Sequence, residues 1–338
     1  MQKRVIYLEH ESQVLKQNPL GDPYHRSLAI YLPPQYESMP DRRYPVIWVL
    51  APFAGWGARY FNQSAWDANI IQRMDQLVDE GRAAPAILAF PDCFTRYGGS
   101  QYLNSSAVGQ YADYVVRELV PFADANFRTL PSAEHRGVMG YSSGGYGALA
   151  FAFSYAGVFG AVACHSGDMF FEYCYRPDFP SAIREFSRAG GLPQFLAELK
   201  TLTHVRDKGK DWFNALNTVA MSAAYSPNPA DPNGFDLPFD LYTGAIIEEV
   251  WARWKALDPI NMASDHINML SDMRAIYFDC GINDEYNLFL GARDLHRTLL
   301  EHKVTHTYEE HEGGHRHINW RYESSLPILT QALSSQDG

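Results

Sequence analysis

Gly140-Tyr-Ser-Ser-Gly-Gly145 stands between a predicted strand over 136–139 and a predicted helix over 144–153. This is a Gly-x-Ser-x-Gly nucleophile elbow in the strand–turn–helix context that the motif requires. The serine of such a turn has a strained backbone, so its neighbours must be small, and the helix N-terminus presents free N–H groups that suit a developing oxyanion. Ser142 is therefore the candidate nucleophile, and Ser143 is a candidate oxyanion-hole donor through its backbone N–H. The alternative is a glycine-rich turn with an incidental serine.

The rest of the chain alternates short apolar runs with amphipathic helical patterns. Predicted strands cover 27–32 (antiparallel), 46–50, 86–90, 136–139, 159–164, 274–278 and 305–310. Predicted helices cover 68–80, 110–126, 144–153, 288–301 and 321–333. Such alternation is typical of a mainly parallel sheet flanked by helices on both faces, so we expect an α/β fold.

Residues 169–257 break this pattern. The segment is rich in prolines and aromatics and has helical patterns over 194–202, 212–224 and 246–255, but no convincing core strand. We interpret it as a helical and loop cap inserted into a core domain made of residues 1–168 and 258–338. Its aromatic residues either line an acyl or aryl pocket or, as we expect for most of them, form the cap's own small core: Phe170, Phe171, Tyr173, Tyr175, Trp212, Phe213, Trp251 and Trp254.

Composition excludes several classes of protein. The chain has 338 residues, 46% of them hydrophobic, and a net charge of −11 with Lys and Arg scattered. Nucleic-acid binding needs a continuous basic face, which is missing. No apolar run is long enough to span a bilayer, and charges interrupt the N-terminus too early for a signal peptide. We expect a soluble cytoplasmic protein that binds neither nucleic acid nor membrane, with homo-oligomerisation left open.

The four cysteines, Cys93, Cys164, Cys174 and Cys280, indicate no special chemistry. Cys164 and Cys280 lie in predicted interior strands, where a thiol behaves as a small hydrophobic group. No pair has metal-ligand spacing, so neither a zinc site nor a disulfide framework is favoured.

A serine nucleophile needs a base, usually a histidine oriented by a third group. In hydrolases with this elbow the chain order is Ser, acid, His. Asp284 follows the end of the 274–278 strand and is the candidate acid, whereas Asp279 is still within the strand and should face a helix or another strand. Glu285 and Asp168 are the alternative acids.

The candidate base lies in the loop after the last predicted strand, in His311-Glu-Gly-Gly-His-Arg-His317. His315 is favoured because the two preceding glycines permit a tight loop, and His311 and His317 are the alternatives. This cluster lacks the helical i, i+4 histidine spacing with carboxylate support, so a metal site is not favoured. Acyl transfer through a serine also needs no organic cofactor, and we expect none.

The second oxyanion donor should follow the 46–50 strand. We expect the backbone N–H of Phe53 in this role, with Ala54 next, because Pro52 has no N–H to donate. Three residues of the loop 94–104, Arg96, Tyr97 and Gln101, are candidates for binding a polar group of the substrate. The alternative is that they only stabilise a long loop.

Several stretches resemble one family over nearly the whole chain. They are Asn18-Pro-Leu-Gly-Asp-Pro23, Tyr31-Leu-Pro-Pro34, Arg43-Tyr-Pro-Val-Ile47, Pro91-Asp-Cys-Phe-Thr-Arg-Tyr-Gly-Gly-Ser100, the elbow, His165-Ser-Gly-Asp168, Asp279-Cys-Gly281 and Gly314-His315. The chain is similar to the esterases related to esterase D and enterochelin esterase, of the α/β-hydrolase superfamily. It departs from many members at Ala51-Pro52, where they carry His-Gly or a similar pair.

The resemblance implies a serine carboxylesterase with Ser142, Asp284 and His315 as triad, and Phe53 with Ser143 as oxyanion donors. Its expected partner is a small ester, with thioesters and aryl esters among the substrates of relatives. One alternative is an acyltransferase that hands the acyl group to an alcohol through the same triad. Another is a non-catalytic hydrolase-like binding protein, which would have no need of the three residues. The cap differs from that of smaller members, so specificity does not transfer.

Overall fold

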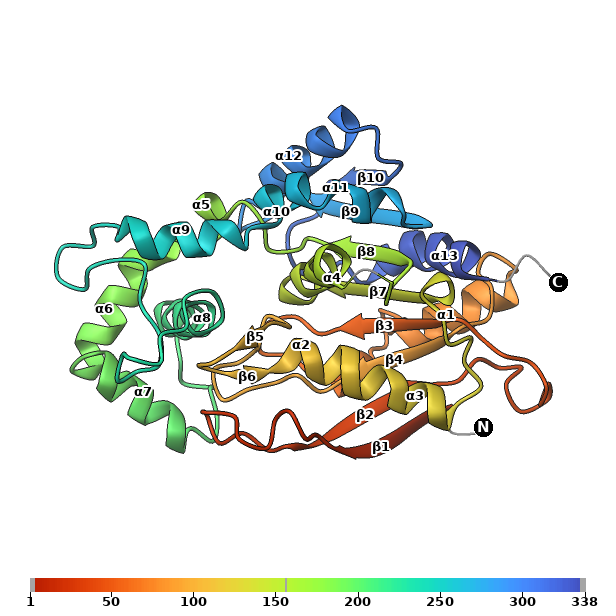
Figure 1. Ribbon diagram of the computed structural model, residues 1–338, viewed down its shortest axis with the longest axis horizontal. Coiled ribbons are helices and arrows are strands. Elements are labelled where there is room, and N and C mark those ends of the chain that lie inside the picture. The colour runs from red at the N-terminus through yellow and green to blue at the C-terminus, as the bar shows by residue number, and fades with distance from the viewer. Residues whose placement is uncertain (1–3, 156, 335–338) are drawn as a thin grey trace.

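The computed structural model describes residues 4–155 and 157–334, which form a central eight-stranded sheet with helices on both faces (Figure 1). The strand order is β1-β2-β4-β3-β7-β8-β9-β10. Strands β1 (Val5–Glu11), β2 (His25–Tyr31) and β4 (Ile87–Pro91) pair antiparallel. The others pair in parallel: β3 (Val46–Leu50), β7 (Arg136–Tyr141), β8 (Ala161–His165), β9 (Ala275–Gly281) and β10 (Thr307–His311). The expected α/β fold with a mainly parallel sheet is confirmed.

The register of the parallel strands brings their carboxyl ends to one edge. Tyr141 of β7 lies opposite His165 of β8, and His165 lies opposite Asp279 of β9. Gly281 in turn lies opposite His311, the last residue of β10. The loops after β7, β8, β9 and β10 therefore emerge side by side, although their residues are far apart in the chain.

Helices cover the two faces because each buried strand has two apolar faces. In β3, the residues 46, 48 and 50 belong to one buried cluster and the residues 47 and 49 to the other. One face is covered by α4 (Ser143–Ser154), α10 (Pro259–Asp265), α11 (Ile267–Ser271) and α12 (Leu288–Glu301). The other is covered by α1 (Ile70–Asp79) and α13 (Tyr322–Leu333), with the short η1 (Gly57–Phe61) beside them. None of the helices in the described ranges is both long and apolar enough to cross a membrane.

The predicted helix over 110–126 has three parts, α2 (Tyr111–Asp113), the π-helical η2 (Tyr114–Leu119) and α3 (Val120–Asn126). Pro121 lies in the first turn of α3 and has no N–H for a helical hydrogen bond. The wide turn of η2 directly before it is the local adjustment expected at such a proline. A two-stranded ribbon of β5 (Asn104–Ser105) and β6 (Gly109–Gln110) precedes this region, and η3 (Ala133–His135) leads into β7.

Helices of residues 169–257 gather beyond one end of the sheet, at the left of Figure 1. They are α5 (Phe171–Cys174), η4 (Arg176–Asp178), α6 (Phe179–Ala189), α7 (Leu192–Thr201), α8 (Lys210–Tyr225) and α9 (Glu248–Ala256). Their apolar residues continue the main core, since the Tyr225 ring packs on Tyr146 of α4 with centroids 5.5 Å apart. The aromatics of this segment therefore pack on one another and on α4 in one continuous core.

The residues that flank the segment 169–257 meet at one buried carboxylate, Asp258. Its oxygens accept the N–H groups of Phe170 at 2.9 Å and Phe171 at 2.6 Å, where the segment begins. They also accept the N–H of Ile260 at 3.3 Å, in the first turn of α10. Burial raises the pKa of Asp258 to about 6, and these three N–H groups oppose the rise. Asp258 thus holds the entry and the exit of the segment together.

Candidate active site

Ser142 occupies the turn between β7 and α4 with φ 57° and ψ −126°, a backbone conformation that L-residues seldom adopt. The turn is held by the Ser142 N–H, which donates to the carbonyl of His165 at 3.0 Å. Two glycines make it possible: a Cβ on Gly140 would lie 2.2 Å from the carbonyl oxygen of Gly144, and a Cβ on Gly144 would lie 2.1 Å from that of Leu50. The elbow expected from the sequence has the geometry that its glycines require.

Three side chains from three loops form a hydrogen-bonded chain. His315 Nε2 lies 3.0 Å from Ser142 Oγ, and His315 Nδ1 lies 2.8 Å from Asp284 Oδ2. Asp284 Oδ1 accepts the N–H of Tyr286 at 2.9 Å, which fixes the orientation of the carboxylate. Asp284 and His315 are 4% and 6% exposed. The structure thus brings together the three residues that the sequence singled out.

His315 is held from several sides. Its backbone N–H donates to Glu285 Oε2 at 2.6 Å, and its carbonyl accepts the hydroxyl of Tyr141 at 2.7 Å. The rings of Tyr141 and Tyr286 pack on the imidazole with centroids 5.0 and 4.7 Å away. A Cβ on Gly281 would lie 2.1 Å from the carbonyl oxygen of Gly313, so the glycine at the end of β9 lets the histidine loop approach. The imidazole is therefore fixed in position before any ligand binds.

The alternative bases lie elsewhere. His311 Nδ1 accepts the N–H of Gly313 at 3.1 Å, and burial lowers the pKa of this imidazole. His317 is exposed at the cavity rim with a left-handed backbone, φ 60°. Neither has a carboxylate partner among the described residues. Glu285, an alternative acid, contacts the backbone of His315 and not its ring.

The backbone donors of an oxyanion hole can be identified from the hydrogen bonds that are already made. The N–H of Ala54 donates to the carbonyl of Gly98 at 2.8 Å, so it is occupied. Within the described ranges the N–H of Phe53 has no acceptor, and Phe53 lines the same cavity as Ser142 and Ser143. Ser143 is the first residue of α4, where N–H groups have no intrahelical partner. The geometry therefore favours Phe53 over Ala54.

Asp168, the other alternative acid, lies beside the nucleophile without contacting His315. Its Oδ2 accepts hydroxyl groups of Ser143 and Tyr175, both at 2.8 Å, and the Gln101 amide at 3.2 Å. Its Oδ1 lies 3.4 Å from Ser142 Oγ. Burial raises the pKa of Asp168, and the hydrogen bonds from Tyr175 and Ser143 oppose the rise. The position of Asp168 just after β8 is the one local signal that indicates this cluster.

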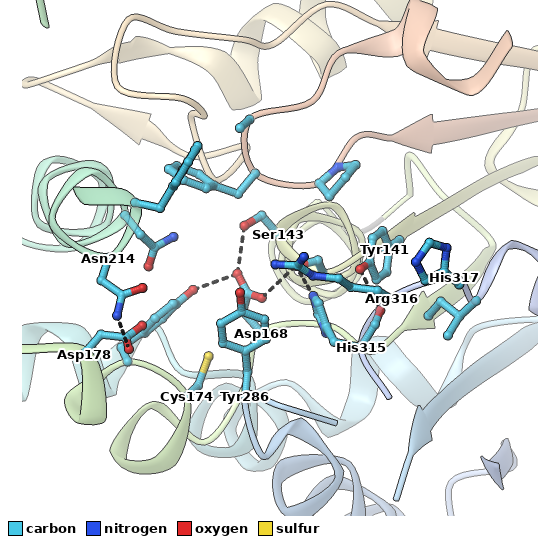
Figure 2. A pocket seen from close by; sticks show the side chains of 18 of the residues that line it. Tyr141, Ser143, Asp168, Cys174, Asp178, Asn214, Tyr286, His315, Arg316 and His317 are labelled. Atoms are coloured by element: carbon cyan, nitrogen blue, oxygen red, sulfur yellow. Dashed lines mark hydrogen bonds between the residues drawn. The ribbon is translucent and has the colours of Figure 1, made fainter. Parts of the chain in front are cut away.

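A cavity of about 490 Å³ opens at the triad (Figure 2). Its wall includes Ser142, His315 and Asp168, and cap residues such as Tyr175 and Phe213. Tyr175 and Phe213 thus line a pocket, which is one of the two roles considered for these aromatics. Most of the other aromatics are part of the buried core.

Arg96, Tyr97 and Gln101, the three candidates for substrate binding, are not part of this cavity wall. The Arg96 backbone N–H is bonded to the Asp22 carboxylate, and Tyr97 packs on Phe235. Gln101 is buried and reaches the site through Asp168 and the Tyr175 hydroxyl, both at 3.2 Å. The loop therefore supports the site from behind, which is the alternative that the sequence left open.

A second Ser-His-Asp arrangement lies under α13. His165 Nε2 is 2.8 Å from Ser325 Oγ, and His165 Nδ1 is 3.0 Å from Asp279 Oδ1. Arg321 Nε donates to Asp279 Oδ2 at 2.7 Å. Burial disfavours ionisation of Asp279, but His165 and Arg321 outweigh it and keep the pKa of this carboxyl below its usual value. Asp279 faces a helix, as the sequence indicated, and not the cavity.

Metal ligands are the remaining chemistry to consider. Across residues 4–155 and 157–334, no three His, Cys, Asp or Glu side chains gather as a metal ion would need.

Comparison with known proteins places the chain in a family. A protein-family model described as "Putative esterase" matches residues 23–323. The chain belongs to this esterase family. Esterase Rv1288 of Mycobacterium tuberculosis is 30% identical over 170 residues, which are 48% of this chain and 32% of that protein. The alignment thus spans about a third of the curated relative.

Solved structures of similar fold cover the whole chain. A ferulic acid esterase has a TM-score of 0.63 at 18% identity, covering 97% of this chain and 98% of its own. An S-formylglutathione hydrolase from Agrobacterium tumefaciens has a TM-score of 0.59 at 16% identity, covering 98% of this chain and 95% of its own. At these identities the likeness establishes the α/β-hydrolase fold of this esterase family member.

Proposed function

We propose that the protein is a serine carboxylesterase that cleaves esters through an acyl-enzyme on Ser142. The observation that carries the proposal is the hydrogen-bonded chain from Asp284 through His315 to Ser142, which ends at the wall of a cavity. Family membership agrees with this chemistry. The names of two structural neighbours, a ferulic acid esterase and an S-formylglutathione hydrolase, add aryl esters and thioesters as substrate classes to test.

The reaction follows from the geometry. Ser142 Oγ attacks the ester carbonyl while His315 Nε2 takes its proton, and Asp284 stabilises the imidazolium through Nδ1. The backbone N–H groups of Phe53 and Ser143 stabilise the oxyanion of the tetrahedral intermediate. His315 then protonates the leaving alkoxide as the C–O bond breaks. Water, deprotonated by His315, attacks the acyl-enzyme carbonyl. The bond from the carbonyl carbon to Ser142 Oγ then breaks as His315 returns the proton to Oγ, and the carboxylic acid leaves.

Residues 169–257 act in this proposal as a cap on the core domain of residues 1–168 and 258–338. Tyr175 and Phe213 of the segment line the cavity beside the triad. The segment therefore contributes to substrate recognition, while the loops after β7, β9 and β10 supply the reacting groups.

The test uses p-nitrophenyl acetate and a fluorophosphonate probe on the purified protein. Wild type should hydrolyse the ester and be labelled, and Ser142→Ala should lose both. Ser325→Ala is the matched control, because Ser325 also lies within 2.8 Å of a histidine nitrogen but is fully buried. Substantial turnover by Ser142→Ala would remove Ser142 from the mechanism, and an unlabelled wild type would favour a non-catalytic binding protein.

A further inference from the structure

The cavity has two arms that meet at Ser142. One arm runs under the cap, where Asp178 and Asn214 lie, and the other runs past His315 to Tyr141 and His317. Figure 2 shows these two pairs on opposite sides, with Asp168 and His315 between them. We call the first the cap arm and the second the histidine arm.

The polar groups of the cap arm are hydrogen-bond acceptors. Asn214 Nδ2 donates to Asp178 Oδ1 at 2.8 Å and to Ser181 Oγ at 2.9 Å, so the amide nitrogen of this buried residue is occupied. That orientation leaves the amide oxygen of Asn214 without a donor in the described part of the chain. Asp178 Oδ2 likewise receives no hydrogen bond from any described residue. Two acceptors therefore line the arm side by side.

Asp178 also lacks a cation at salt-bridge distance among the described residues. Burial raises the pKa of Asp178 to about 6, and the exposed Lys210 opposes the rise only through its charge. Asp178 is half-buried and lines the cavity. A substrate group that displaces water from these acceptors loses free energy unless it brings a hydrogen-bond donor of its own. Phe213 and Tyr286 flank the route from Ser142 with aromatic surface.

The mechanism decides which half of the ester enters the cap arm. His315 protonates the leaving alcohol, so the alcohol has to lie on the histidine side of the scissile bond. The histidine arm continues there into a second hollow of about 230 Å³, which shares Arg59, Tyr141 and Asn319 with the cavity. The acyl group, which stays on Ser142, then extends under the cap.

We propose that the cap arm selects acyl groups that carry a hydrogen-bond donor, a hydroxyl or an ammonium, beyond a short apolar stem, and that Asp178 and Asn214 are the residues that select them. This inference rests on the proposed esterase function and adds the substrate class. A plain aliphatic acyl chain of the same length leaves both acceptors unpaired and is disfavoured.

The experiment compares three methyl esters of matched length on the full chain: methyl heptanoate, methyl ω-hydroxyhexanoate and methyl ω-aminohexanoate. Release of acid is followed by pH-stat titration at neutral pH. One hydrogen bond to a charged group corresponds to about tenfold or more in kcat/KM, so at least one donor-bearing ester should exceed heptanoate by that factor. Comparing the hydroxyl-bearing ester with the ammonium-bearing ester shows which donor is preferred.

Variants test the assignment to Asp178. Asp178→Leu should remove the preference for both donor-bearing esters, and Asp178→Asn should reduce the ammonium preference more than the hydroxyl preference because only the charge is lost. Glu249→Gln is the control, because this exposed carboxylate of α9 lies in the cap but not on the cavity wall. It should keep the wild-type preference. Thermal melts of each variant establish that the fold is intact.

Three results would overturn the inference while ester hydrolysis stands. The first is equal or better turnover of methyl heptanoate by wild type. The second is a donor preference that survives in folded Asp178→Leu. The third is a preference seen only when the donor is in the alcohol half, tested with hexyl acetate against the monoacetate of hexanediol. Absence of hydrolysis of every ester would instead overturn the proposed function itself.

Discussion

The molecule contains two Ser-His-Asp arrangements of almost the same geometry. In one, His315 lies 3.0 Å from the Ser142 hydroxyl and 2.8 Å from Asp284. In the other, His165 lies 2.8 Å from the Ser325 hydroxyl and 3.0 Å from Asp279. The imidazole lies between a hydroxyl and a carboxylate in both cases.

Their surroundings differ in three ways. Ser142 lies on a strained turn at a cavity, whereas Ser325 lies within α13 and is 0% exposed. Backbone N–H groups that are free to stabilise an oxyanion flank the first serine, and helix hydrogen bonds engage the backbone around the second. Arg321 also pairs with Asp279, while Asp284 has no cationic side chain among its hydrogen-bond donors. Access, oxyanion donors and charge balance thus distinguish the candidate catalytic site from a structural one.

The largest expected effect is on turnover. Asp284→Asn should lower kcat for p-nitrophenyl acetate by about 10⁴-fold, because the amide stabilises the wrong imidazole tautomer and does not stabilise the imidazolium. Asp279→Asn should leave kcat per folded molecule within a few-fold of wild type. Steady-state kinetics corrected for active sites by fluorophosphonate titration checks both. Similar losses in kcat for the two variants would contradict the distinction.

Asp279→Asn should instead act on stability. Removing the Asp279 carboxylate from the buried network costs up to about 3–5 kcal/mol, since Arg321 is left with Glu309, a more exposed carboxylate, as its ion-pair partner. The pKa of Asp279 lies below its usual value in the folded protein. Its stabilisation is therefore present above the unfolded pKa of about 4 and is lost as the pH falls through the folded pKa. Urea unfolding at several pH values should show that the wild type has a larger free energy of unfolding than Asp279→Asn. The difference should decrease as the pH falls.

A smaller effect is expected at Glu285, which holds the backbone N–H of His315 at 2.6 Å. We infer that it is a positioning residue for the base. Glu285→Ala should lower kcat about tenfold with little change in KM, and Glu285→Gln, which keeps an acceptor oxygen, should restore most of it. The kcat-against-KM comparison of the two variants separates positioning from a general loss of stability. Equal kcat values for wild type and Glu285→Ala would contradict the role.

Ser325→Ala should have the smallest effect. It removes one hydrogen bond to His165 and should cost about 1 kcal/mol of unfolding free energy, with activity and fluorophosphonate labelling unchanged. A thermal melt and the ester assay check the two parts. Labelling at Ser325 in the Ser142→Ala background would show that the buried arrangement is reactive after all.

The sequence predicts well what local patterns encode. The elbow at 140–145 requires glycines at fixed spacing, and the buried parallel strands are continuous apolar runs. Asp284 and His315 could be chosen because each follows a strand in the chain order that this elbow requires. Parallel strand ends then meet at one edge without further information.

The sequence analysis predicts neither β1 nor α6. Strand β1 received no prediction because, at the edge of the sheet, none of its residues is buried and no apolar face repeats. Helix α6 was not assigned a helical pattern within the cap, although Pro180 in its first turn and Gly190 at its end are ordinary helix signals. The predicted helix over 110–126 is interrupted by the π-helical turn η2 and continues as α3. The interruption lies directly before Pro121, which cannot donate a helical hydrogen bond.

Contacts between distant residues account for the remaining differences. Gln101 points to Asp168 and not to the cavity, since its left-handed backbone, φ 51°, turns the side chain inward. The Asp279, His165 and Arg321 network depends on the register between β8 and β9, which no local pattern specifies. Charged residues inside apolar strands were the available signal, because buried charges need partners.

The Asp258 carboxylate affects how freely the sequence of residues 169–257 can vary. A long segment whose two ends are fixed at one point is a closed loop. The entropic cost of closing a loop rises only slowly with its length. Insertions, deletions or exchange of sequence within residues 169–257 can therefore change what is recognised without shifting the strands that hold the reacting groups. We propose that Asp258 marks the two points, beside Phe171 and Ile260, between which the sequence of the segment can vary, provided that its contacts with the main core are kept.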